Sequence, residues 1–237
     1  MSPPPQGEVV YGRNPVRELL AAGRRHVHEV WALRQLHDEP WLRGARPKPR
    51  QRDELGRAAG TSDHQGVVAF ADPYPYASTA EVLEGDGPVV CLDGAQDPRN
   101  LGAICRVADG AGAVGLVIAR RGSPGVTPTV CKASAGAVEH MRVAQVESIN
   151  GFIGEARDRG RVIVGADPEG GADFRDGVIP RHSVIVLGSE GAGLRPKVSA
   201  ACDRLVRIPM GGRVASLNIS VAAALMLYEA GRPASPR

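Results

Sequence analysis

The sequence predicts an α/β protein with a mostly parallel sheet, preceded by a smaller α/β unit. In the last two thirds of the chain, short apolar runs alternate with stretches of helical periodicity. The runs are apolar at consecutive positions rather than at alternate ones, which is typical of parallel strands covered on both faces. Loops that contain Gly or Pro follow several of these runs, and ligands bind at such strand ends in α/β sheets.

The small α/β unit is predicted to end before residue 73. Apolar side chains at helical spacing after Tyr11-Gly12-Arg13-Asn14-Pro15 indicate its helix, and two runs rich in β-branched and aromatic residues indicate its strands. The sequence Pro73-Tyr74-Pro75-Tyr76 then interrupts the unit, because proline lacks the N–H that a continuing strand needs. The predicted elements are a helix with Val16, Leu19 and Leu20, and strands at Val27–Leu33 and Val67–Phe70.

The larger unit is expected to follow a linker. We predict domains at residues 1–75 and 87–237, with residues 76–86 as the linker. Gly231 and Pro233 mark the end of the last helix, because both residues are common just beyond a helix C-terminus. The predicted strands are Val89–Leu92, Gly115–Ala119, Arg161–Ala166, Ser183–Leu187 and Leu205–Ile208, and the predicted helices are Leu101–Gly110, Thr127–Ala137, Ile149–Arg159, Pro196–Ala201 and Leu217–Ala230.

Composition and charge narrow the class of protein. With 237 residues, 43% of them hydrophobic, the chain can bury one good core and a second, smaller one. A formal charge of +3 permits an anionic partner without requiring one. No apolar run is long enough to span a membrane and the start lacks a signal-peptide pattern, so we expect a cytoplasmic protein. The four cysteines lack C-x-x-C spacing and the six histidines lack ligand spacing, which predicts buried free thiols and no metal site.

Two other patterns need an interpretation. Gly110-x-Gly112-x-x-Gly115 has the glycine spacing of a dinucleotide site, but here the helix comes before it and the strand after it. That order is reversed, so we interpret it as a tight turn. A basic stretch interrupted by two prolines is not expected to be helical, and it is equally well explained as a solvated loop or as an arm that contacts phosphates. Its basic residues are Arg43, Arg46, Lys48, Arg50 and Arg52.

Three loop sequences in the larger unit carry most of the functional information. They are Asp93-Gly94-Ala95-Gln96-Asp97-Pro98-Arg99-Asn100-Leu101-Gly102 with a later Arg106, then Leu187-Gly188-Ser189-Glu190-Gly191-Ala192-Gly193, and finally Ile208-Pro209-Met210 followed by Ser216-Leu217-Asn218. In this order and spacing they resemble the three signature motifs of the SpoU-type (TrmH-like) RNA ribose 2'-O-methyltransferases, within the SPOUT superfamily. The resemblance covers nearly the whole chain.

The N-terminal unit resembles a second known domain. Tyr11-Gly12-x-x-Pro15-Val16 and His64-Gln65-Gly66-Val67 are similar to the small ribosomal-protein-like RNA-binding domain of the bacterial 23S rRNA guanosine 2'-O-methyltransferases. That resemblance implies that the N-terminal domain grips RNA and that the catalytic domains pair as a homodimer. It also favours an RNA contact for the basic stretch.

The resemblance implies a fold and two sets of site residues. The fold would be a mostly parallel sheet with a deep trefoil knot near its C-terminal end, a rare exception to unknotted connectivity. Bent S-adenosylmethionine (AdoMet) would be the methyl donor, with no metal. The donor side would comprise Gly188, Ile208, Met210, Ser216 and Leu217, and the acceptor side would comprise Asn100, Arg106, Glu190 and Asn218.

Single residues on the acceptor side also have structural interpretations. Asn100 is suited to cap the helix from Leu101, Glu190 to cap the turn before Pro196, and Asn218 to form a polar start of the last helix. A guanidinium keeps its positive charge, so we interpret Arg106 as a clamp on a phosphate beside the ribose rather than as a base. The combination of these residues in register favours function.

The sequence therefore predicts AdoMet-dependent 2'-O-methylation of a ribose in RNA, with a guanosine of 23S rRNA as the favoured target. Relatives that modify tRNA usually lack the small N-terminal domain, which ranks tRNA second. Two further alternatives are a resistance-conferring rRNA methyltransferase of the same two-domain plan and a non-catalytic RNA-binding ribosome assembly factor.

Overall fold

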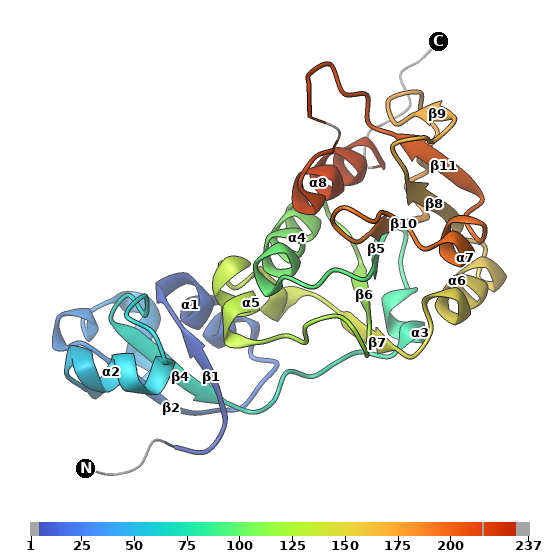
Figure 1. Cartoon of the computed structure of the whole chain (residues 1–237). Helices are drawn as coiled ribbons and strands as arrows, with labels where there is room; N and C mark the ends of the chain where they lie inside the picture. Colours follow the sequence, from blue (N-terminus) through green and yellow to red (C-terminus); the bar gives the residue numbers. More distant parts are fainter. Residues whose placement is uncertain (1–4, 215, 231–237) are drawn as a thin grey trace.

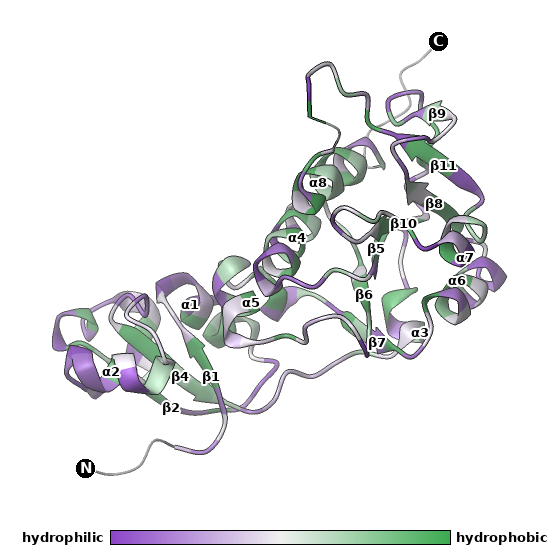
Figure 2. Cartoon of the chain, viewed as in Figure 1, coloured by the Kyte–Doolittle hydropathy of each residue, from purple (hydrophilic) through white to green (hydrophobic). Residues whose placement is uncertain are grey.

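The computed structural model describes residues 5–214 and 216–230, and it contains two separate β-sheets. Figure 1 shows the smaller sheet, built by the N-terminal part of the chain, at one end of the molecule and the larger sheet at the other. The smaller sheet has the strand order β1-β4-β2-β3, and the larger has the order β7-β6-β5-β10-β8-β11-β9. In Figure 2 the strands of both sheets are mainly hydrophobic, whereas α2 and several loops are hydrophilic.

The smaller sheet is covered on both faces. Along its central strand, Val67 and Ala69 pack with residues of α1, whereas Val68 and Phe70 pack with Leu55 of α2. Both β1 and β2 pair antiparallel to the central strand β4, and the short edge strand β3 pairs parallel to β2. The elements are β1 (Glu8–Tyr11), α1 (Arg13–Ala22), β2 (Val27–Ala32), two 3-10 helices (Arg34–Leu36 and Pro40–Ala45), β3 (Lys48–Pro49), α2 (Arg52–Ala59) and β4 (Val67–Ala71).

The larger sheet is parallel in all of its pairings between described strands. Val90 and Leu92 of β5 pack in a core with α4 and α8, whereas Val89 and Cys91 of the same strand pack in a second core with α6. Both faces are therefore covered, as the continuous apolar runs predicted. The strands are β5 (Val89–Asp93), β6 (Gly115–Ala119), β7 (Val143–Val146), β8 (Val162–Ala166), β9 (Ala172–Asp173), β10 (Ser183–Gly188) and β11 (Arg204–Arg207).

The helices of the larger unit follow the prediction with changes at their ends. Helix α5 ends at Ala133 rather than at Ala137, because Ala135 and Gly136 adopt left-handed backbone angles, with φ of 52° and 91°. The predicted end of the last helix at Gly231 lies outside the described residues. The helices are α3 (Thr79–Val82), α4 (Pro98–Gly110), α5 (Pro128–Ala133), a 3-10 helix (Ala137–His140), α6 (Ile149–Asp158), α7 (Pro196–Ser199) and α8 (Ile219–Ala230).

The basic stretch is more ordered than the sequence suggested. The expectation that it is not helical is wrong at both ends, because Arg43 lies in a 3-10 helix and Arg52 begins α2. Between them, Lys48 lies in β3 and forms an ion pair with Glu29, at 2.7 Å. The guanidinium of Arg50 stacks 4.7 Å from the ring centre of Trp31. Part of the stretch therefore stabilises the N-terminal sheet.

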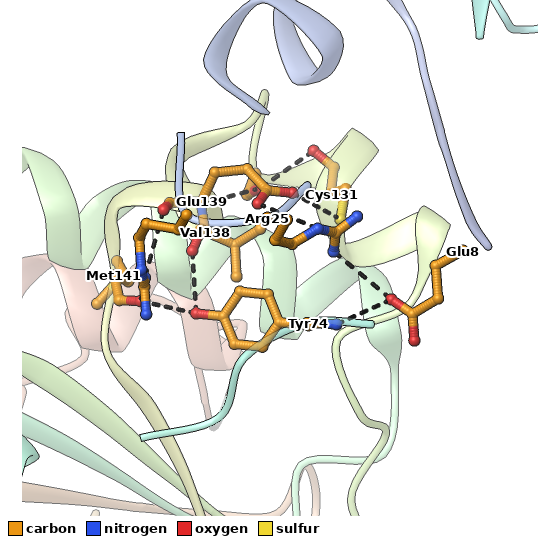
Figure 3. A network of polar contacts seen from close by, with 9 residues as sticks. Glu8, Arg25, Tyr74, Cys131, Val138, Glu139 and Met141 are labelled. Carbon is orange, nitrogen blue, oxygen red and sulfur yellow. Dashed lines mark hydrogen bonds and ion pairs between the residues drawn. The ribbon is translucent and has the colours of Figure 1, made fainter. Parts of the chain in front are cut away.

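The N-terminal unit is attached to the larger unit by buried polar groups (Figure 3). The hydroxyl of Tyr74 donates to the carbonyls of Val138 and Met141, at 3.1 and 2.7 Å. The side chains of Arg25 and Glu139, each 1% exposed, form an ion pair at 3.7 Å. Burial raises the pKa of Glu139 above its usual value, and Arg25 opposes that shift.

A buried arginine stabilises the start of the larger sheet. Arg161, immediately before β8, is 2% exposed and donates to the carbonyls of Leu83, Gly85 and Gly87 at 2.7 to 2.9 Å. These carbonyls belong to the segment that leads into β5. The side chain of Arg161 therefore satisfies three backbone acceptors of this segment.

Two sequence predictions can be compared directly with the structure. The cysteines are free, and three are buried while Cys202 is half-buried, which confirms most of that prediction. The glycine pattern at residues 110–115 is the turn between α4 and β6, as predicted. The trefoil knot stays a prediction. Separately, none of the helices among the described residues is long and apolar enough to cross a membrane.

Candidate functional site

The candidate site lies at the carboxyl edge of the larger sheet, where β5 and β10 end side by side. These strands pair in parallel, with Gly188 opposite Asp93 at the last position of the ladder. The loop after β5 leads into α4, and the loop after β10 forms a hairpin. Because the two loops leave neighbouring strand ends at the same level, their side chains can meet above the sheet.

Three of the four predicted acceptor-side residues meet there. Asn100 Nδ2 donates to Glu190 Oε1 at 2.6 Å. Asn218 Nδ2 lies 3.1 Å from the same oxygen and 3.1 Å from Asn100 Oδ1. These three side chains come from α4, from the hairpin after β10 and from the segment just before α8. We call them the acceptor cluster.

Helix α4 presents Asn100 in its first turn. Asp97 is the N-cap, and its carboxylate accepts from the backbone N–H of Arg99 at 2.8 Å, with Pro98 as the first helical residue. The interpretation of Asn100 as the N-cap is therefore wrong. The helix starts earlier because an Asp-Pro pair favours a cap followed by the first helical position. The side chain of Asn100 is left for the acceptor cluster.

Close packing fixes α4 against α5. A Cβ atom at Gly102 would lie 2.5 Å from Cβ of Ala133 and 2.8 Å from the carbonyl oxygen of Val130. Only glycine permits this approach of the two helices. The position of Asn100 is thus set by backbone packing as well as by the cap.

The hairpin after β10 presents Glu190 at its tip. Ser189 and Gly193 exchange two backbone hydrogen bonds of 3.0 Å. A Cβ atom at Gly188 would lie 2.0 Å from the carbonyl carbon of Gly193, so the tight return needs glycine there. The interpretation of Glu190 as a cap before Pro196 is wrong, because its carboxylate accepts hydrogen bonds from the two asparagines instead.

Asn218 has two roles at once. Its Oδ1 accepts from the backbone N–H and the hydroxyl of Ser220, at 2.9 and 2.6 Å. That side-chain bond accounts for α8 beginning at Ile219 rather than at Leu217, since Asn218 acts as a cap. The prediction of a polar helix start is confirmed, and the amide nitrogen still reaches the acceptor cluster.

Arg106 does not join the acceptor cluster. It lies on α4 two turns beyond Asn100, and its side chain is exposed. Within the described part of the chain, Arg106 forms no hydrogen bond or ion pair. Its guanidinium is therefore available to an anionic ligand.

The predicted donor-side residues are arranged around the same edge. Gly188 ends β10, and Ile208 follows β11, which is separated from β10 by β8. Met210 and Leu217 are half-buried, and Ser216 is exposed, all on the segment between β11 and α8. Figure 1 shows the part of this segment that follows β11 arching away from the sheet. No hydrogen bond joins Ile208 or Met210 to Gly188 among the described residues.

Sequence reasoning gave no role to one ion pair at this edge. The side chain of Asp93 is 0% exposed and accepts from the backbone N–H and the Nε of Arg195, at 3.0 and 2.7 Å. The sequence does offer one signal for this ion pair, which is the carboxylate of Asp93 at the end of an otherwise apolar strand. In the described ranges, no group of three His, Cys, Asp or Glu side chains is arranged to hold a metal ion.

Comparisons with known proteins show the family to which the chain belongs. A model of the SpoU rRNA methylase family matches residues 87–228, and a model of the RNA 2'-O ribose methyltransferase substrate-binding domain matches residues 9–77. A Staphylococcus haemolyticus protein assigned to the TrmH family of tRNA/rRNA methyltransferases is 37% identical over 241 residues, which cover 94% of this chain and 95% of that protein.

Solved structures extend the comparison. The AdoMet-bound rRNA methyltransferase of Sinorhizobium meliloti has a TM-score of 0.80 and 25% identity, over 94% of this chain and 86% of that one. The TrmH/SpoU tRNA modifying enzyme of A. aeolicus has a TM-score of 0.55 and 28% identity, over 65% of this chain and 79% of that one. From the family match and the curated relative, the chain belongs to the SpoU rRNA methylase family and is an RNA methyltransferase.

Proposed function

We propose that this protein transfers the methyl group of AdoMet to the 2'-hydroxyl of a ribose in RNA, with a guanosine of 23S rRNA as the favoured target. The observation that carries the proposal is the acceptor cluster, in which Asn100, Glu190 and Asn218 are held together at a sheet edge by three loops distant in sequence. Holding an acceptor in line with a donor supplies several kcal/mol toward such a transfer.

The residues near the ends of β10 and β11 fit AdoMet. Gly188 ends β10, so its peptide groups would lie beside a ligand bound at this edge of the sheet. The half-buried Ile208, Met210 and Leu217 offer apolar surface to an adenosine, and the exposed Ser216 offers a hydroxyl. AdoMet supplies an activated methyl group when bound. The AdoMet in the Sinorhizobium meliloti structure supports this assignment.

The acceptor cluster would align the ribose. Both asparagine amides donate to Oε1 of Glu190, so Oε2 is left to accept a hydrogen bond from the RNA. Arg106 would hold a neighbouring phosphate with its fork of N–H donors and offset charge that develops at the ribose oxygen. The proton of the hydroxyl passes to a phosphate oxygen or to water. These four residues are our proposed catalytic set.

The N-terminal unit would contact RNA outside the site. We keep residues 1–75 as the RNA-binding domain, 76–86 as the linker and 87–237 as the catalytic domain, supported by the two sheets and the two matched ranges. In the basic stretch, Arg43 and Arg46 are exposed and form no hydrogen bond or ion pair with described residues. They are therefore better candidates for phosphate contacts than Lys48 and Arg50, which stabilise the small sheet.

A cavity of about 350 Å³ on the same unit is a second candidate RNA contact. Its lining combines guanidinium, amide and indole groups, which suit a nucleotide. The guanidinium of Arg13 is paired with Glu39, so the cavity favours a base over a phosphate. It is lined by Arg13, Asn14, Arg17, Glu39, Trp41 and Gln65.

The presence of the N-terminal unit favours rRNA over tRNA. The compared rRNA methyltransferase aligns with 94% of this chain, whereas the tRNA modifying enzyme aligns with 65%. A substrate-binding domain beside the catalytic domain suits a large, folded RNA target.

A homodimer is part of the same proposal. Val221, Leu225 and Tyr228 are 46%, 37% and 61% exposed, and their spacing places them on one face of α8. An apolar stripe of this kind is suited to a second copy of the chain. The mass of the protein in solution, measured by light scattering, tests this point.

The test of the function is methyl transfer from labelled AdoMet to unmodified 23S rRNA and to tRNA, followed by digestion to nucleosides. We expect label in 2'-O-methylguanosine from 23S rRNA, and we expect Asn100→Ala and Arg106→Ala to abolish it. Label from tRNA alone would support the methyl-transfer reaction but would assign tRNA, not 23S rRNA, as the substrate. RNA binding without label from either RNA would contradict the proposal and favour an assembly factor.

A further inference from the structure

The ion pair of Asp93 and Arg195 closes the hairpin that carries Glu190. Asp93 ends β5, and Arg195 lies at the far end of the hairpin, immediately before α7. One carboxylate oxygen accepts from the backbone N–H of Arg195 and the other from its Nε, so both the main chain and the side chain are held. The carboxylate is completely buried, although 64% of the arginine side chain is exposed.

The hairpin is therefore fixed at three levels. Gly188 packs directly on the backbone of Gly193, and Ser189 and Gly193 exchange hydrogen bonds of 3.0 Å. The hydrogen bonds to Asp93 then join Arg195, the last residue of the hairpin, to the neighbouring strand β5. Glu190 lies at the tip, beyond these attachments, where its carboxylate accepts from Asn100 and Asn218. A shift of the hairpin base would move both the end of β10 and the carboxylate of Glu190.

A second pair of the same chemistry lies at the opposite edge of the sheet. Asp203, just before β11, accepts from the backbone N–H of Ile163 at 2.8 Å and from Nε and Nη2 of Arg157 at 3.2 and 2.9 Å. It too joins a carboxylate to one backbone N–H and one arginine. It is remote from the acceptor cluster, because it lies at the amino ends of the strands.

We propose that Asp93 and Arg195 are positioning residues for methyl transfer, which set the hairpin of residues 188–195 so that AdoMet binds beside Gly188 while Glu190 reaches the acceptor cluster. This inference rests on the proposed function. The hydrogen bond to Asp93 raises the pKa of Arg195, which is consistent with a pair that remains charged. Neither residue touches the reacting atoms; both act through the backbone of the hairpin.

The test compares full-length variants at the two edges. AdoMet affinity is measured by calorimetry, and kcat and KM are measured for AdoMet and for the RNA substrate. We expect Asp93→Asn and Arg195→Gln to weaken AdoMet binding about tenfold and to lower kcat, because the loss of a charge-assisted hydrogen bond releases the hairpin base. Asp203→Asn is the control of the same chemistry, and we expect its AdoMet affinity and kcat to stay within about twofold of wild type.

Three results separate the explanations. Wild-type AdoMet affinity and kcat in both Asp93→Asn and Arg195→Gln would overturn the positioning role. An equal loss in Asp203→Asn would also overturn it, because the effect would then follow general stability. If Asp93→Asn does not fold, Arg195→Gln decides alone. A wild-type protein that neither binds AdoMet nor methylates RNA would contradict the proposed function instead.

Discussion

The two edges of the larger sheet use the same kinds of polar side chain for different purposes. At the amino edge, Arg161 and Asp203 bond to backbone groups and so fix turns and strand ends. At the carboxyl edge, Asn100, Glu190 and Asn218 bond to one another across three loops. The polar groups at the amino edge therefore bond mainly to the backbone and stabilise the fold, whereas the acceptor cluster brings side chains from three loops together at the candidate site.

Electrostatics accounts for part of the difference. Glu190 lies near the first turn of α4, where the helix dipole favours a negative charge. Arg106 lies two turns along the same helix without a hydrogen bond or ion pair to any described residue, so it can neutralise an incoming phosphate. At the amino edge, the guanidinium of Arg161 is buried and donates to three backbone carbonyls, so it is not accessible to a phosphate.

Removal of an acceptor-cluster amide should have the largest effect. We expect Asn100→Ala to reduce kcat about 100-fold or more, in the range seen when one aligned hydrogen-bond donor is removed from an active site. Tm should change little, because Asp97 still caps α4. Steady-state kinetics and thermal unfolding measure the two quantities. Asn150→Ala, which removes an exposed asparagine from the first turn of α6, is the control and should leave kcat unchanged.

Removal of the amino-edge arginine should change stability instead. We expect Arg161→Met to lower the free energy of unfolding by about 2 kcal/mol, because three backbone carbonyls lose their donor. Denaturant unfolding measures this loss. Activity per folded molecule should equal that of wild type. A fall in kcat without a loss of stability would contradict the assignment of a purely structural role to the amino edge.

Replacement of the free arginine by lysine should have an intermediate effect. Arg106→Lys keeps the charge but loses the planar fork, so we expect an increase in KM for RNA and a fall in kcat/KM of about tenfold. AdoMet affinity should not change. Arg34→Lys, an exposed arginine of the N-terminal unit, is a suitable control. Near-normal turnover of Arg106→Lys would count against the phosphate clamp.

The smallest effect should be a pH dependence at the amino edge. Burial opposes ionisation of Asp203, but hydrogen bonds from Ile163 and Arg157 outweigh it and hold its pKa below the usual 3.8. Its contribution to stability is therefore present above pH 3.8 and is lost as the pH falls through the lowered pKa. Because the side chain is 37% exposed, we expect less than about 1 kcal/mol.

Thermal unfolding of wild type and Asp203→Asn across this acid range measures the effect. The difference in Tm should be largest above pH 4 and should shrink below it. A difference that stays constant across the range would show that the charge of Asp203 contributes nothing.

The sequence predicted the strands of the larger unit well, because they are continuous apolar runs. The predicted Val89–Leu92, for example, differs from β5 by one residue. It did not predict β7 or α2, because β7 is only four residues long and α2 is rich in charged residues. Short or polar elements form through tertiary packing rather than through a strong local pattern.

The sequence motifs named the three residues of the acceptor cluster but did not predict how their side chains contact one another. Residues of the acceptor cluster were identified by their motifs, yet the hydrogen bonds among them join positions 28 to 118 residues apart. The pair of Asp93 and Arg195, 102 residues apart, left no local signal beyond the buried carboxylate. The error at Asn100 was avoidable, because Asp97-Pro98 is itself a helix-start signal.

The central claim is that the acceptor cluster orients RNA rather than AdoMet, and Glu190→Gln tests it most directly. This change preserves size but removes the charge and the free carboxylate oxygen. We would measure AdoMet affinity by calorimetry and single-turnover methyl transfer to 23S rRNA for the variant and wild type. The account predicts AdoMet affinity within about twofold of wild type and transfer at least about 100-fold slower. Transfer at the wild-type rate, or loss of AdoMet binding with no separate defect in transfer, would contradict it.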